Sequence, residues 1–134
     1  MNVKKVIDEL KKNYPGSNII INDPVTPTEV ICEVEPASWD PEKSVSIVVF
    51  DGKIKHPHGF TKEKYEVLKG VLEMTKEGKT FFLTEGQKIE INMDEFHMAK
   101  GKDTWVQVTS IPAWTPDGVV SMDSGTFEYK KLSH

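Results

Sequence analysis

Three of the four histidines and one glutamate have the residue types and spacing of a metal site. His56 and His58 are two residues apart, so on an extended strand both imidazoles leave the same face, with Cα atoms ~7 Å apart. Glu63 follows a short stretch that can reverse the chain, and His97 comes from a later segment. Imidazole and carboxylate ligands together suit Mn, Fe, Co, Ni or Zn rather than Ca or Mg. We therefore predict one divalent transition-metal ion at His56, His58, Glu63 and His97.

The start of the chain predicts one helix, and the remainder predicts strands. In residues 2–13, apolar residues recur at the three-and-four spacing of a helix, which Pro15 and Gly16 end. The period then changes to two, with Gly, Pro, Asn and Asp clusters between β-branched and aromatic runs. Many short strands without intervening helices predict a sandwich or barrel. We expect strands at residues 18–22, 29–35, 44–50, 53–58, 65–75, 79–84, 87–92, 104–111 and 125–129.

The spacing of the candidate ligands resembles that of the cupin superfamily. The first cupin motif reads HxH, three or four residues, Glu, six residues, Gly, and it is matched by HPH at residues 56–58, Glu63 and Gly70. The second motif reads Gly, five residues, PxG, two residues, His. Gly86 and His97 match its two ends, while Asn-Met-Asp replaces the PxG turn. The two motifs together are much more specific than an isolated HxH pair.

This resemblance implies a fold and a set of metal ligands. The implied fold is all-β, a single cupin barrel (a jelly roll or double-stranded β-helix) with a short N-terminal α-helix. We expect one domain over residues 1–134, with the helix at about 2–13 and the barrel at about 18–130. In the family, the histidines and glutamate of the first motif and the histidine of the second bind the metal, which assigns that role to the four residues above. Four protein ligands on an octahedral ion leave two adjacent positions for water, substrate or dioxygen.

Two aromatic residues are candidates for the substrate side of the site. Tyr65 shares a strand face with Glu63, so its hydroxyl can hydrogen-bond a ligand or act as an acid, although packing is the commoner role of such a tyrosine. The stretch SIPAWTPDG at residues 110–118 is similar to one in small cupins described as sugar-phosphate-isomerase-like. Trp114 within it can form an aromatic wall against a sugar ring or cover the open end of the core. By strand alternation, Ile54 is expected to face inward with His56.

These residues predict a metal-dependent enzyme that acts on a small polar metabolite, a sugar or organic acid that chelates the ion. Isomerase- or epimerase-type chemistry is expected if the metal polarises a carbonyl and a side chain such as Tyr65 moves the proton. A mononuclear non-haem iron dioxygenase is an alternative, as is a barrel that binds a metabolite without turnover. Because many chemistries share this fold and ligand set, the metal, substrate and reaction stay open.

Composition and charge limit the partners. The chain of 134 residues is 37% hydrophobic and 28% charged, which is ordinary for a globular protein. Its net charge of -4 and its lack of a clustered basic face argue against nucleic acid. It has no apolar run of membrane-spanning length, no secretory-signal pattern and only one cysteine, Cys32, so we expect a cytoplasmic protein that does not bind membranes. Cupin barrels commonly pair through edge strands, so the resemblance also implies a homodimer.

Overall fold

The computed structural model describes residues 1–56, 61–93, 95–114 and 130–131, of which 55–56 and 130–131 are described by their backbone alone. The chain opens with the helix α1 (Val3–Asn13), which the sequence predicted. The side chain of Asn2 caps this helix by accepting a hydrogen bond from the backbone N–H of Lys5. Val6 and Leu10 are buried on its apolar face. No helix in the described part of the chain is long and apolar enough to cross a membrane.

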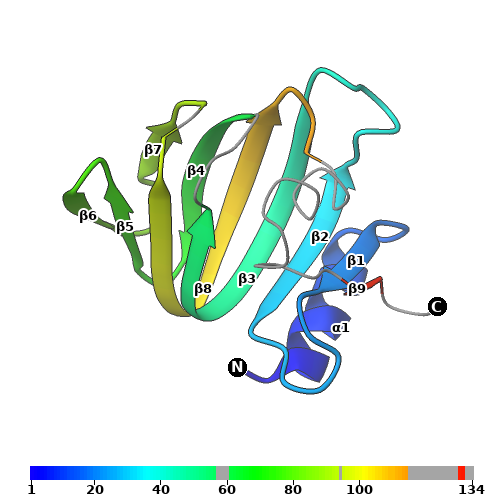
Figure 1. The fold of residues 1–134 in the computed structure, drawn as a ribbon. Helices are drawn as coiled ribbons and strands as arrows, with labels where there is room; N and C mark the ends of the chain where they lie inside the picture. Colours follow the sequence, from blue (N-terminus) through cyan, green and yellow to red (C-terminus); the bar gives the residue numbers. More distant parts are fainter. Residues whose placement is uncertain (57–60, 94, 115–129, 132–134) are drawn as a thin grey trace.

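The remaining described elements are strands of one antiparallel sheet (Figure 1). The order in the sheet is β6-β5-β8-β3-β2-β1-β9, and β4 pairs with both β8 and β7. The strand bounds are β1 (Asn18–Ile21), β2 (Glu29–Glu35), β3 (Ser44–His56), β4 (Lys62–Lys69), β5 (Leu72–Lys76), β6 (Lys79–Leu83), β7 (Lys88–Ile91), β8 (His97–Ile111) and β9 (Lys130–Lys131).

The longest two strands, β3 and β8, form a bent ribbon. They pair from Ser44 opposite Ser110 to His56 opposite His97, with an irregularity in register between Phe50 and Gly52. One half of the ribbon pairs with β2 and β4, and the other half pairs with β5. Figure 1 shows that the ribbon turns back on itself, so its two halves face each other across the interior. The sheet therefore curls into the cupin-like barrel expected from the sequence.

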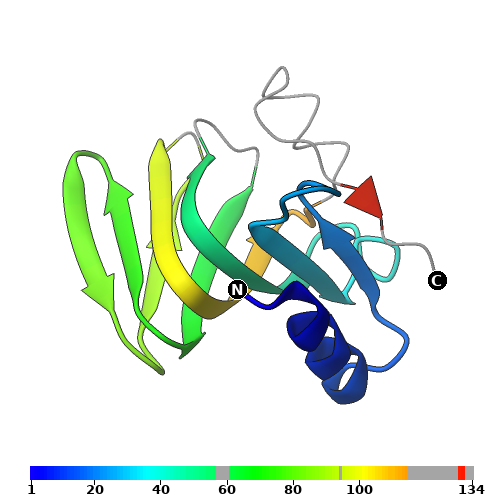
Figure 2. The same cartoon turned by 90° about the horizontal axis from the view of Figure 1, so that it is seen from below.

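Both faces of the central strands are buried, each in its own core. The interior core of the barrel contains side chains such as Ile31, Val48, Phe50 and Leu72. The second core lies between the outer face of the sheet and α1, which covers β1 and β2 in Figure 2. Its members are Val6, Leu10, Ile19, Ile21, Val30, Cys32, Ile47, Val49 and Trp105. This double burial explains why β2 and β3 have apolar residues on both faces.

Several strand boundaries differ from the expected ones. The prediction of a single strand at 65–75 is wrong, because Gly70 adopts a φ of 85° and separates β4 from β5. The strands predicted at 44–50 and 53–58 are continuous as β3 as far as His56. The strand predicted at 104–111 begins earlier, at His97. The strand predicted at 125–129 lies outside the described residues.

Gly101 lies in the bend of the ribbon, where a side chain has no space. A Cβ atom at this position would lie 2.7 Å from the Cβ of Thr104 and 3.1 Å from Cε2 of Phe50. The hydroxyl of Thr104 donates a hydrogen bond to the carbonyl of Val71 at 2.9 Å, so its movement would also disturb the start of β5. We predict that Gly101→Ala lowers the free energy of unfolding by about 1–3 kcal/mol, measured by urea denaturation.

Lys100→Ala is the matched control for this variant. Lys100 is the exposed neighbour of Gly101 on β8, so its truncation should change the free energy of unfolding by less than about 0.5 kcal/mol. If Gly101→Ala is as stable as Lys100→Ala, close packing at the bend does not constrain the ribbon.

Candidate functional site

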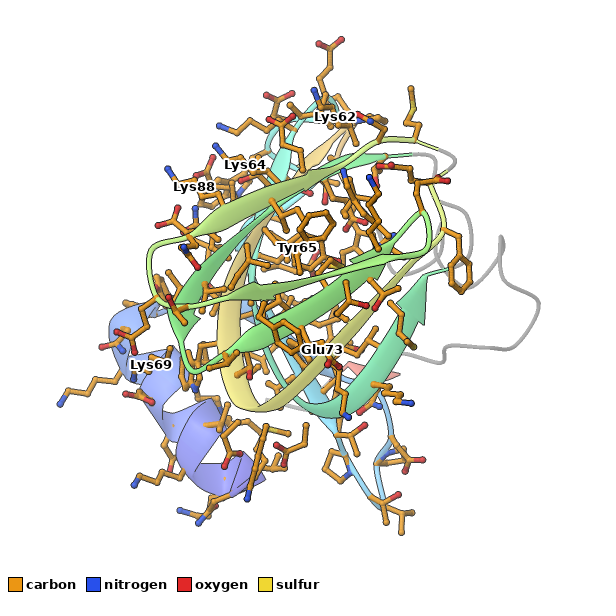
Figure 3. All side chains as sticks on the ribbon, turned by 90° about the vertical axis from the view of Figure 1, so that its left-hand side faces the viewer. Lys62, Lys64, Tyr65, Lys69, Glu73 and Lys88 are labelled. Carbon is orange, nitrogen blue, oxygen red and sulfur yellow. The ribbon has the colours of Figure 1, made fainter. Side chains whose placement is uncertain are left out.

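Strand β4 directs one acid and one phenol into the barrel. Lys62 and Lys64 are exposed, whereas the alternate residues Glu63 and Tyr65 are 8% and 5% exposed. Figure 3 shows the two lysines on the outside of the strand and Tyr65 inside. The two lysine side chains lie in solvent, and the interior face of the strand has one carboxyl and one hydroxyl group.

His97 meets these two groups from the opposite side of the barrel. It is the first residue of β8, is 1% exposed, and stands opposite Lys76 on β5. Its Nε2 atom lies 3.5 Å from Oε1 of Glu63 and 3.4 Å from the hydroxyl of Tyr65. No ladder joins β4 to this end of β8, so the bend of the ribbon is what brings the three side chains together.

The hydrogen bonding of His97 determines which ring nitrogen carries a proton. Its Nδ1 atom lies 3.3 Å from the backbone carbonyl of Glu95. Because a carbonyl oxygen only accepts, Nδ1 donates the hydrogen bond, and the lone pair of the neutral ring is on Nε2. Metal-binding histidines are usually fixed in this way through their second nitrogen. Nε2 can therefore accept the Tyr65 hydroxyl proton or act as a metal ligand.

Burial disfavours the charged forms of both Glu63 and His97. Burial raises the pKa of Glu63 from 4.5 to about 7. Burial likewise lowers the pKa of His97, against a smaller opposing effect of its hydrogen bond to the Glu95 carbonyl. Burial therefore favours the neutral form of each of the two side chains in this contact over an ion pair. A bound cation would relieve the cost of ionising Glu63 in this position.

The structure describes part of the ligand set predicted from the sequence. It brings Glu63 and His97 together, and it places the backbone of His56 directly opposite His97 in the β3–β8 ladder. His58 lies outside the described residues, and the side chain of His56 is not described. Among the residues that are described, no group of three or more His, Cys, Asp and Glu side chains is close enough to hold a metal. The two donors that are described, a carboxyl oxygen and an imidazole nitrogen, fit a transition-metal ion.

A cavity inside the barrel lies next to this group. Its volume is about 40 Å³, space for about three water molecules, within a hollow of about 490 Å³ that includes the open mouth. The buried side chain of Ile54 lines the cavity. Trp114 also lines it, and the backbone N–H of Trp114 donates a hydrogen bond to the hydroxyl of Ser44 at 2.8 Å. The lining residues are Glu29, Ile31, Ser46, Val48, Phe50, Ile54, Glu63, Tyr65, Ala99, Val106, Val108, Ser110 and Trp114.

Three polar residues of the cavity wall were not predicted from the sequence. Glu29, Ser46 and Ser110 line the cavity and are 3%, 7% and 3% exposed. The available signal was strand alternation, because Glu29 shares a face with Ile31, opposite the face of Val30.

Comparison with known proteins shows the fold. No family model matches the sequence, and no curated protein sequence is significantly similar to it. Among solved structures, KdgF from Halomonas sp. has a TM-score of 0.60 at 22% identity, covering 69% of this chain and 88% of KdgF. Ectoine synthase from P. lautus has a TM-score of 0.64 at 16% identity, covering 84% of this chain and 81% of ectoine synthase. Streptomyces Pac13, described as a nucleoside dehydratase, has a TM-score of 0.58 at 11% identity, covering 78% of each chain. The chain thus has a cupin fold, which solved proteins of varied chemistry share.

The charge state of Glu63 is open to direct measurement in protein freed of metal by a chelator. Between pH 4.5 and about 7 the unfolded chain ionises this residue while the folded chain keeps it neutral, so the contribution of Glu63 to stability falls as pH rises. We predict that Glu63→Gln gains stability relative to wild type over this range, by about 3 kcal/mol in total. Urea unfolding at a series of pH values measures the difference.

The exposed Glu85 provides a matched control for the loss of one carboxyl group. Glu85→Gln should follow the wild-type pH profile. Parallel profiles for wild type and Glu63→Gln would contradict a raised pKa at Glu63.

Proposed function

We propose that this protein is a metal-dependent enzyme for a small polar metabolite, with Glu63, His97, His56 and His58 as the metal ligands. The observation that carries the proposal is the approach of His97 Nε2 to Glu63 Oε1 at 3.5 Å in a buried site. The lone pair of Nε2 lies beside an acid whose pKa is raised to about 7 by burial. Directly opposed residues of an antiparallel pair have Cα atoms about 4.5–5.5 Å apart, which supports His56 as a neighbouring ligand.

The chain's own side chains supply the rest of the proposed chemistry. A bound transition-metal ion would act as a Lewis acid toward a substrate carbonyl or hydroxyl. Tyr65 lines the cavity beside the proposed ligands, and we assign its hydroxyl to move a proton between a substrate carbon and oxygen in an isomerisation or epimerisation. Trp114, which lines the cavity and packs on the interior core, is assigned to cover a sugar or organic acid and to exclude water. The expected homodimer and cytoplasmic location stay predictions.

Elemental analysis of protein purified without a histidine tag tests the metal site. Wild-type protein should carry about one transition-metal ion per chain, and His58→Ala should lower metal affinity by about 10–100-fold or more because a ligand is lost. His134→Ala is the matched control, since His134 is the histidine outside the two motifs. Equal metal content in wild type and His58→Ala would end the proposed site.

Exchange of carbon-bound hydrogen tests the reaction class. Metal-loaded protein in D2O is incubated with a panel of aldoses and ketoses, and deuterium on the carbon next to the carbonyl is measured by mass spectrometry. We expect exchange in wild type and a loss of about 10²–10⁴-fold in Tyr65→Phe, which keeps the ring but removes the hydroxyl. The metal content of Tyr65→Phe should equal that of wild type.

Tyr14→Phe is the matched control for this experiment, because Tyr14 packs against the outer core beside α1, away from the cavity. Exchange at the wild-type rate in Tyr65→Phe would contradict the assigned proton transfer. Oxygen uptake without hydrogen exchange would favour a dioxygenase over an isomerase. Saturable binding of a sugar without exchange or oxygen uptake would indicate a metabolite-binding protein.

A further inference from the structure

His97 follows directly after a turn whose shape depends on side-chain contacts. The turn covers residues 92–96, between β7 and β8, and contains neither proline nor glycine. Proline fixes φ and glycine allows tight reversals, so without them other contacts have to define the turn. We propose that Lys76 and Glu95 are positioning residues that hold the ring of His97 with its Nε2 atom toward Glu63. The inference rests on the proposed function only in taking this ring as a metal ligand.

Glu95 is held in the turn by both its backbone and its side chain. Its N–H donates a hydrogen bond to the carbonyl of Asn92 at 3.2 Å, and its Oε1 accepts one from the N–H of Asn92 at 2.8 Å. The side chain is 14% exposed, so little water competes for these contacts. The backbone carbonyl of Glu95, which lies 3.3 Å from Nδ1 of His97, therefore has a defined position.

Lys76 connects this turn to two strands. As the last residue of β5, it stands opposite His97 in the β5–β8 ladder. Its Nζ atom donates a hydrogen bond to the carbonyl of Glu90 on β7 at 2.8 Å and lies 3.6 Å from Oε1 of Glu95. Lys76, Glu95 and His97 thus form a closed ring of contacts, because strand pairing joins the first of them to the last. Glu95 cannot move away from His97 without losing its contacts to Asn92 and Lys76.

The position of the Glu95 carbonyl decides which nitrogen of His97 is free to bind an ion. A carbonyl oxygen only accepts, so the neutral ring carries its proton on Nδ1 and its lone pair on Nε2. If the carbonyl moves away, this preference weakens. The other tautomer then becomes accessible, and its protonated Nε2 cannot bind a metal. Loss of such an outer partner typically lowers metal affinity by about 10–100-fold.

The positive charge of Lys76 makes the test specific for positioning. A nearby ammonium group repels a bound cation, so if Lys76 acted only through its charge, Lys76→Met would bind a metal ion more tightly. If Lys76 acts by holding Glu95, the same variant binds the ion more weakly. We expect the dissociation constant for Co²⁺, measured by titration of its absorption spectrum, to rise by about tenfold in both Lys76→Met and Glu95→Ala. In the Glu95→Ala background, Lys76→Met should not weaken binding further, because both changes break the same contact.

The tautomer of His97 is a second readout that needs no metal. In metal-free wild type at mildly alkaline pH, long-range ¹H–¹⁵N correlation spectra should show the His97 ring protonated at Nδ1. The signals of this ring are assigned by their loss in His97→Gln. Lys76→Met and Glu95→Ala should each lower the fraction of the Nδ1-protonated tautomer.

Lys100→Met is the matched control, because Lys100 is an exposed lysine of the same β5–β8 ladder, opposite Glu73. It should keep the wild-type tautomer and the wild-type affinity for Co²⁺. Unchanged or tighter Co²⁺ binding in Lys76→Met, further weakening in the double variant, or an Nε2-protonated ring in wild type would overturn the proposal. If wild type binds no Co²⁺, the proposed metal site fails, whereas the tautomer spectra still decide whether Lys76 and Glu95 position the ring.

Discussion

The pairing of β3 with β8 along a bent ribbon is the constraint on which the site depends. The ladder continues from Ser44 opposite Ser110 to His56 opposite His97, through a register irregularity at Gly52. A straight ribbon would hold His97 far from β4, which pairs with the other end of β8. Because the ribbon bends, His97 and Glu63 face each other although no backbone hydrogen bond joins their segments. The glycines of the bend thus position the candidate ligands as much as the ligands' own strands do.

The same burial that builds the core also sets the chemistry of the polar groups inside it. Glu63 and His97 lie among apolar side chains. Burial raises the pKa of Glu63 and lowers the pKa of His97, which favours the neutral form of each. A carboxylic acid and a neutral imidazole in contact can be stabilised by sharing a proton or by binding a cation. The fixed Nδ1 hydrogen bond to the Glu95 carbonyl keeps the ring oriented in either case. Burial makes an ionised Glu63 unfavourable, and this cost is removed either when Glu63 is protonated or when a cation binds to it. The two processes therefore compete.

Sequence periodicity predicted the helix, most strands and a sandwich or barrel, because each depends on local alternation and turn residues. The cupin fold was implied by the resemblance of the two motifs. Periodicity failed at Gly70, where an apolar run continues on both sides of a residue with positive φ, so no change of pattern marks the break. Motif spacing identified Glu63 and His97, but their contact depends on the bend, which local patterns do not encode. Glu29 was missed because a glutamate at a strand start resembles a solvated residue until the structure shows both faces of β2 buried.

The fold and the candidate metal ligands together do not specify a substrate, and the reason is geometric. The motif specifies residues on β4 and at the ends of β3 and β8. The rest of the cavity wall comes from inward positions of β2, β3 and β8 that the motif spacing does not constrain, including Glu29, Ser46 and Ser110. Cupins of different chemistry can thus keep one metal-binding arrangement and vary the opposite wall. In this chain that wall has one carboxyl group and two serine hydroxyl groups among apolar side chains.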